Sequence, residues 1–117
     1  RTRTIEGTWI DLFEGSRFFE GQDLSEACGT AFMRGAWFEP ALDQAQAELV
    51  RRNRSSGVFI SKYGSWPVAA YSVKFVGHHE IIGLGFGHMS ASPSEFVAEH
   101  VLSIRPLPRP RCDIRPD

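Results

Sequence analysis

Four histidines are the side chains of this 117-residue chain that could hold a metal ion. His78 and His79 are adjacent, so on a strand they would point to opposite faces. His88 and His100 fall on different predicted strands and could meet only if those strands pair. With nearby carboxylates they could bind zinc, but none of the usual zinc-ligand spacings occurs. A small metal-dependent enzyme that uses His88 and His100 is therefore the alternative hypothesis rather than the preferred one.

Catalytic patterns based on cysteine or glycine are incomplete. A thiol enzyme would need a histidine beside Cys28, and nothing in the sequence brings one there. Gly83, Gly85 and Gly87 are not followed by the Lys-Ser/Thr pair of a phosphate-binding loop. The third of these glycines also comes one residue too early for the dinucleotide fingerprint. We therefore lean towards a non-catalytic function and expect no cofactor.

Aromatic residues support a binding function better. Trp37 and Trp66 fall in predicted loops, and Phe18 and Phe19 form a short aromatic segment after a turn. Any one ring in a domain of this size is more often part of the core than of a ligand site. Rings near loops and strand ends are nevertheless where a β-domain can contact a ligand. The preferred hypothesis is a non-catalytic binding or interaction module that uses these four residues.

Composition limits the choice of partners. The formal net charge is -1 and 42% of the residues are hydrophobic, as in one globular domain. A nucleic-acid partner is not favoured, because phosphate neutralisation normally requires a concentrated basic face. No apolar run is long enough to span a membrane, so we expect a soluble domain without a membrane partner. The ligand or protein partner, the oligomeric state and the compartment stay open, since an export signal could have been removed before Arg1.

The first half of the chain predicts a strand and a helix. Thr2–Phe13 interleaves polar and large apolar residues, as a half-buried strand does, and its central Gly7 would allow it to coil. The rings of Arg17–Glu20 are expected to pack rather than to face solvent. Pro40–Asn53 is the best helical segment, because proline is tolerated at the first helical position and mostly strong helix formers follow. The sequence therefore predicts one helix in the middle of the chain.

The second half predicts four strands with short connections. Three of them are Val58–Tyr63, Val68–Val76 and Glu95–Ile104. The fourth is the glycine-rich strand that ends at Met89, and Gly77–Glu80 would be the turn that leads into it. In the last strand, strict alternation puts His100 in the apolar row, where we expect a buried and hydrogen-bonded imidazole.

The tail Arg105–Asp117, rich in proline and arginine, predicts an extended segment that follows a single domain of residues 1–104. It could lie over the domain or fray. One disulfide between Cys28 and Cys112 could tie it to the body in an oxidising compartment. Two unpaired thiols are at least as well supported by the sequence.

Together these elements predict a mainly β domain with one inserted helix, built as a small antiparallel β-barrel or a strongly curved sheet. The order of strands and helix is similar to that of an oligonucleotide- and oligosaccharide-binding type barrel, which places a helix between its third and fourth strands. The resemblance is architectural and involves no shared motif. It implies a fold and leaves the ligand open.

Overall fold

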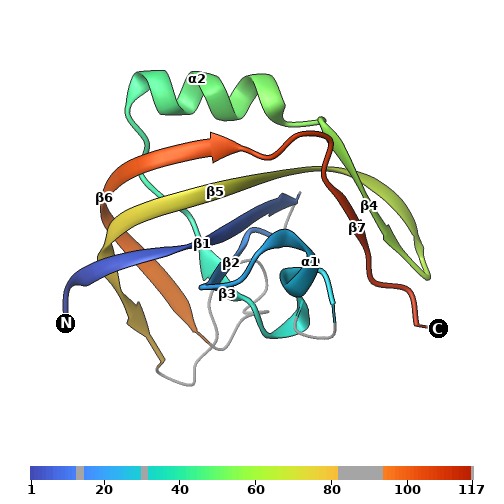
Figure 1. The fold of residues 1–117 in the computed structure, drawn as a ribbon, viewed down its shortest axis with the longest axis horizontal. Helices are drawn as coiled ribbons and strands as arrows, with labels where there is room; N and C mark the ends of the chain where they lie inside the picture. Colours follow the sequence, from blue (N-terminus) through green and yellow to red (C-terminus); the bar gives the residue numbers. More distant parts are fainter. Residues whose placement is uncertain (13–14, 30–31, 82–93, 117) are drawn as a thin grey trace.

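The computed structural model describes residues 1–12, 15–29, 32–81 and 94–116, which form a mostly β chain (Figure 1). The described strands are β1 (Arg3–Leu12), β2 (Arg17–Glu20), β3 (Ala36–Phe38), β4 (Gly57–Ser61), β5 (Gly64–Glu80), β6 (Glu95–Pro106) and β7 (Arg111–Asp113). The helical segments are α1 (Leu24–Ala27), the short 3-10 helix η1 (Phe32–Arg34) and α2 (Gln44–Asn53). Among these, α2 alone is longer than a single turn, so the prediction of a mainly β domain with one substantial helix is confirmed.

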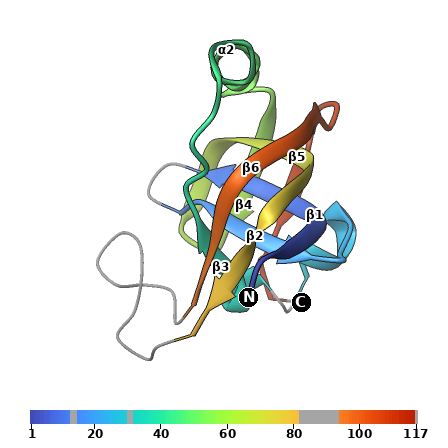
Figure 2. The ribbon, with the colours of Figure 1, turned by 90° about the vertical axis from the view of Figure 1, so that its left-hand side faces the viewer.

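The described strands belong to one sheet, and five of them close into a ring. The ring has the order β1-β2-β3-β6-β5 and closes because β1 pairs with β5 along its whole length. β4 and β7 continue the sheet beyond β5 (Figures 1 and 2). The sheet is mixed rather than antiparallel as predicted, because β3 runs parallel to β6 and β4 runs parallel to β7. A long connection joins the strands of each parallel pair, which allows the chain to return in the same direction.

α2 covers one end of the ring (Figure 2). The Tyr71 hydroxyl donates a hydrogen bond to the backbone oxygen of Val50 at 3.2 Å. The side-chain amide of Gln46 donates to the backbone oxygen of Val101, also at 3.2 Å. These bonds hold the helix against β5 and β6, and its apolar side packs on the rings inside.

Inside the ring, aromatic side chains touch in a continuous series that we call the aromatic column. Its members, in order from α2, are Tyr71, Trp9, Phe38, Phe18, Phe96 and His79, with Phe75 packed beside Phe18 and Phe38. The centroids of successive rings lie between 4.2 and 5.6 Å apart, within the range of favourable aromatic pairs. The column therefore connects the helix-covered end of the ring with its opposite end.

A second apolar cluster lies on the other face of β2. Its buried members are Ile10, Phe19, Ala27, Cys28, Phe32, Phe59, Val68 and Cys112. Phe18 and Phe19 point to opposite faces of β2, so Phe18 joins the aromatic column and Phe19 joins this second cluster. The sequence left the pairing of the cysteines open, and the structure joins Cys28 to Cys112 with Cα atoms 5.2 Å apart. The disulfide thereby connects the end of α1 to β7.

The start of α2 differs from the prediction. The helix begins at Gln44 rather than at Pro40. The Asp43 side chain accepts from the backbone nitrogen of Gln46, and the Gln46 side chain accepts from the backbone nitrogen of Asp43. This capping box satisfies two backbone donors, which explains why the helix begins after Asp43.

β5 and β6 contain two further differences. β5 continues to Glu80, so Gly77–Glu80 is part of a strand and the predicted turn there is wrong. Two register shifts in the pairing of β5 with β6 also change which residues of β6 face inward and which face outward. As a result His100 is exposed on the outer face, and Val101 takes the inner position opposite Phe75. The prediction of a buried imidazole at His100 is therefore wrong.

The C-terminal tail takes part in the sheet. β6 continues to Pro106, and Arg111–Asp113 forms β7, which pairs with β4. The backbone oxygen of Pro110 accepts from the backbone nitrogen of Val58 at 2.9 Å, immediately before this pairing. The tail therefore lies on the body of the protein over Arg111–Asp113.

The predicted glycine strand with Gly83, Gly85 and Gly87 lies outside the described residues. Within the described ranges, none of the helices has the length and apolar character needed to cross a membrane.

Candidate ligand-binding site

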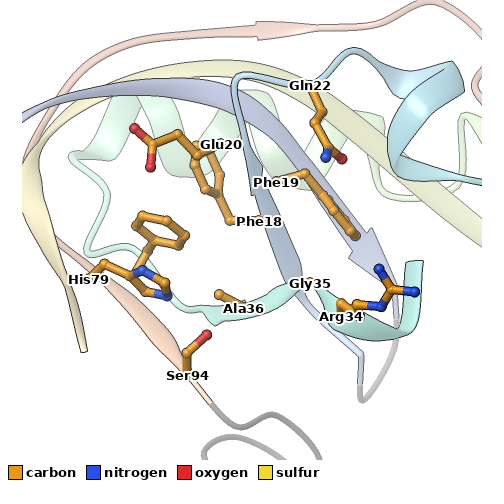
Figure 3. A pocket seen from close by; sticks show the side chains of 10 residues that line it. Phe18, Phe19, Glu20, Gln22, Arg34, Gly35, Ala36, His79 and Ser94 are labelled. Carbon is orange, nitrogen blue, oxygen red and sulfur yellow. The ribbon is translucent and has the colours of Figure 1, made fainter. Parts of the chain in front are cut away.

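A cavity of about 230 Å³ opens at the end of the ring opposite α2, and we call it the ring-end cavity (Figure 3). It is lined by Phe18, Phe19, Glu20, Gln22, Arg34, Gly35, Ala36, His79, Ser94 and Phe96. These residues come from β2, β3, β5, β6 and the segments beside them. The closure of the ring therefore assembles the cavity from parts of the chain that are distant in sequence.

His79 is the last ring of the aromatic column and forms part of the aromatic wall of the cavity. Its ring stacks on Phe96 with the centroids 4.2 Å apart and the planes 5° from parallel. Burial lowers the pKa of His79, an effect that Glu20 opposes and Arg3 reinforces. The lowered pKa favours the neutral imidazole, in which one ring nitrogen can donate a hydrogen bond and the other can accept one.

Glu20 contributes a carboxylate to the rim of the cavity. Arg3 donates two hydrogen bonds to it, and the one from Nη2 to Oε1 is 2.9 Å long. The hydrogen-bonded Arg3 is the main cause that lowers the pKa of Glu20, and His79 acts in the same direction. Glu20 is therefore ionised at neutral pH and is a fixed hydrogen-bond acceptor.

The remaining walls supply further polar groups. Figure 3 shows Arg34 and Gln22 on the side away from His79, with the Ser94 side chain next to Ala36. Ser94 is buried, and its backbone oxygen accepts from the backbone nitrogen of Trp37 at 2.9 Å, which fixes its position beside β3. The cavity thus combines an aromatic face with a carboxylate, a guanidinium, a hydroxyl and an amide.

The fold places the four aromatic residues that were predicted to bind a ligand in different parts of the structure. Phe18 and Phe19 both line the ring-end cavity, although each is buried. Trp37 lies in β3 with 9% of its surface exposed, and its Nε1 donates to Glu39 at 2.9 Å. Trp66 lies in β5 on the hairpin with β4 and is 41% exposed. The predicted loop positions of both tryptophans are wrong, because strands extend through them.

The histidines considered as metal ligands do not meet in the described structure. His88 lies outside the described residues, and His100 is exposed opposite Val76. The Nε2 atom of His78 lies 2.7 Å from Oε2 of Glu80, so this histidine contacts a carboxylate rather than another histidine. Within residues 1–12, 15–29, 32–81 and 94–116, no three histidine, cysteine, aspartate or glutamate side chains are grouped so that they could hold a metal ion.

Sequence reasoning named Phe18 and Phe19 but missed the other residues of the cavity, His79 and Glu20 among them. His79 continues the inward row of Tyr71, Val73 and Phe75 at every second position of β5, so a longer strand would have placed it on the same side, at the open end of the ring. Glu20 gave no comparable signal, because its position depends on a contact with Arg3 between separate strands.

Comparisons with protein-family models, with curated proteins and with solved structures find no match to this chain. The geometry of the cavity is therefore the basis for a functional proposal.

Proposed function

We propose that this protein is a non-catalytic binding module that takes its ligand in the ring-end cavity. The observation that carries the proposal is the end of the aromatic column. There the His79 ring, stacked on Phe96, meets a cavity whose rim holds the Glu20 carboxylate and the Arg34 side chain. An aromatic face supplies contact area, and a few convergent polar groups orient what it binds.

The cavity favours a small uncharged ligand with several hydrogen-bonding groups. Its volume of about 230 Å³ is smaller than that of most drug-sized sites, roughly 300 to 1,000 Å³. Glu20 accepts hydrogen bonds, Arg34 donates them, and the Ser94 hydroxyl can do both. Because the rim carries both signs of charge, it gives no advantage to a ligand of one charge. A single sugar ring has this size and this chemistry.

The surroundings of His79 support binding rather than acid–base catalysis. A catalytic histidine of the triad type is oriented by a carboxylate and lies within hydrogen-bonding distance of a nucleophile. Here both carboxylate oxygens of Glu20 accept from Arg3. The His79 ring itself stacks on Phe96. The imidazole is thus arranged as a stacked wall rather than as a base.

We also propose that the ring has the arrangement of an oligonucleotide- and oligosaccharide-binding type barrel. β1, β2 and β3 are successive antiparallel neighbours, and β5 returns through a long connection to pair with β1, which is a Greek-key order. α2 falls between the third and fourth strands of the ring. These features support the fold proposal and do not identify a ligand.

Trp66 is the rival contact for a binding module that uses exposed aromatic residues. Its ring is partly exposed and rests on Phe59, with centroids 6.3 Å apart. It does not line the ring-end cavity. A variant at each place therefore distinguishes the two sites.

Protein-observed NMR with glucose, N-acetylglucosamine, glycerol and acetamide as probes tests the proposal. We expect at least one probe to shift the resonances of Glu20, Ala36, His79 and Ser94 in a saturable way. His79→Ala should abolish these shifts, because the probe loses its aromatic wall, and Trp66→Ala should leave them unchanged. Thermal melting of both variants checks that the fold is retained.

Shifts confined to the hairpin around Trp66 would contradict the cavity assignment. The same holds if none of the four probes shifts the cavity resonances, or if Trp66→Ala and His79→Ala weaken binding equally.

A further inference from the structure

A larger groove of about 640 Å³ lies on the outer face of the sheet. Its floor includes a row of register neighbours across three strands, Thr8 of β1, Ser72 of β5 and Arg105 of β6. One wall is formed by residues 21–25, which lead into the start of α1, and the other is Leu107 with Pro108. This volume is well within the range of small-molecule sites, roughly 300 to 1,000 Å³.

The groove and the ring-end cavity share Gln22 as a lining residue. The backbone oxygen of Gln22 accepts a hydrogen bond from Oγ1 of Thr8 at 2.6 Å, which fixes the loop beside the floor of the groove. The side-chain Oε1 of Gln22 is buried and has no hydrogen-bond partner among the described residues. A chain-like ligand could therefore begin in the cavity and extend past Gln22 into the groove.

The groove favours hydroxyl-bearing ligands. Ser72 presents a hydroxyl, Glu6 and Asp23 carry carboxylates, and Arg105 carries a guanidinium. The two carboxylates disfavour a polyanion such as nucleic acid, whose binding depends on neutralising phosphates. Donors and acceptors are both available to a neutral chain with many hydroxyl groups.

Peptide binding by strand addition does not fit the part of the floor that β1 and β5 form. From Gly7 to Ile10, β1 pairs with β2 on one edge and with β5 on the other. β5 in turn lies between β1 and β6 at Ser72. Strand addition requires a free backbone edge, and β1 and β5 have none at Thr8 and Ser72.

We propose that the ligand is a neutral oligosaccharide, with one sugar unit in the ring-end cavity and the following units in the groove. This inference rests on the proposed function, because the cavity is the first of the subsites. The groove is larger than the cavity, about 640 Å³ against about 230 Å³, and so has room for more than one further unit. The affinity of the protein then rises with the length of the sugar chain.

Isothermal titration calorimetry with cello-, malto- and chito-oligosaccharides of one to six units tests this inference. In the preferred series we expect about a tenfold increase in affinity between one unit and four, as two or more added hydrogen bonds would give. Arg105→Ala should remove most of that increase while leaving the affinity for one unit unchanged.

Lys74→Ala is the matched control, because Lys74 is an exposed basic residue in the next row of the same face and does not line the groove. It should leave the affinities for all chain lengths unchanged. His79→Ala should weaken binding at every length, because each ligand uses the cavity.

Equal affinity for one unit and for six would overturn the inference, as would equal losses in Arg105→Ala and Lys74→Ala. The same conclusion follows if no oligosaccharide binds while glycerol or acetamide occupies the cavity, and the proposed function would then still hold. Absence of every probe from the cavity would instead overturn the proposed function itself.

Discussion

Two series of touching aromatic rings lie on opposite faces of β2, and they end in different surroundings. The inner series is the aromatic column, which ends at His79 in the ring-end cavity. The outer series runs through Phe19, Phe32, Phe59 and Trp66, with successive centroids 6.0, 5.0 and 6.3 Å apart. His79 shares its cavity with Glu20 and Ser94, whereas Trp66 lies on the hairpin of β4 and β5. An exposed ring is therefore a stronger candidate for a ligand site where polar groups converge on it.

The two series also differ in what holds them in place. The column is enclosed by five strands that close on themselves and by α2. The outer cluster is covered by α1, η1 and β7, which are each only three or four residues long, and the Cys28–Cys112 disulfide joins two of them. We therefore expect the column to be stable by packing and the outer cluster to depend on the covalent bond.

The largest effect is expected in the column. Phe38 is completely buried and touches Trp9, Phe18 and Phe75, so Phe38→Ala leaves a large cavity. It should lower the free energy of unfolding by about 3 to 5 kcal/mol, measured by denaturant titration. Tyr63→Ala is the control, because Tyr63 is 78% exposed. A loss of under about 1 kcal/mol at Phe38 would mean that the column is not the main core.

Removing the disulfide should have the next largest effect. Cys28→Ala combined with Cys112→Ala opens a loop that spans 84 residues and should cost about 2 to 4 kcal/mol of stability. Hydrogen exchange should become faster at α1 and β7 and change little in β5 between Tyr71 and Phe75. An equal acceleration in both regions would contradict the separation of the two clusters.

A smaller loss is expected at the bulged pairing of β5 with β6. A Cβ atom at Gly77 would lie 1.9 Å from the backbone oxygen of Val97, so the strands must move apart in Gly77→Ala. The expected cost is about 1 to 3 kcal/mol, measured by thermal melting. Gly29→Ala is the control, because its nearest contact would be 3.4 Å away. Equal melting temperatures for the two variants would show that β6 can shift at no cost.

The smallest effect concerns pH. Because the pKa of His79 is lowered in the folded protein, the unfolded chain binds a proton more readily at this residue. Stability from this residue is present above about pH 6.5 and is lost as the pH falls towards the lowered pKa. Melting temperatures of the wild type and of His79→Gln should therefore converge on acidification. If the difference between the two melting temperatures instead grows as the pH falls, the ionisation of Glu20 rather than that of His79 controls how stability depends on pH at this site.

The local elements of the fold could be predicted from the sequence, and the closure of the ring could not. The alternation in Thr2–Phe13 and in Glu95–Ile104 gave β1 and β6, because alternation is a local property. Pairing of β1 with β5 joins distant parts of the chain and leaves no local signal. The strand in the tail was equally hidden, since Arg111–Asp113 stands next to prolines and is fixed by its pairing with β4 and by the disulfide.

The candidate site could be predicted only in part. Phe18 and Phe19 were recognised as packed aromatic residues, which they are, and both reach the cavity. His79 was assigned to the predicted turn Gly77–Glu80, although these residues lie inside β5, where Val97 approaches Gly77 closely. Its place at the cavity follows only when β5 is long enough to put His79 against Phe96 of the neighbouring strand.

A crystal structure of the protein with its best-binding small probe tests the central claim most directly. The claim is that the ligand occupies the end of the aromatic column. We predict that the probe lies against the exposed face of His79 and is hydrogen-bonded to Glu20, Arg34 or Ser94. A probe bound against Trp66 on the hairpin, with the ring-end cavity empty, would contradict this account.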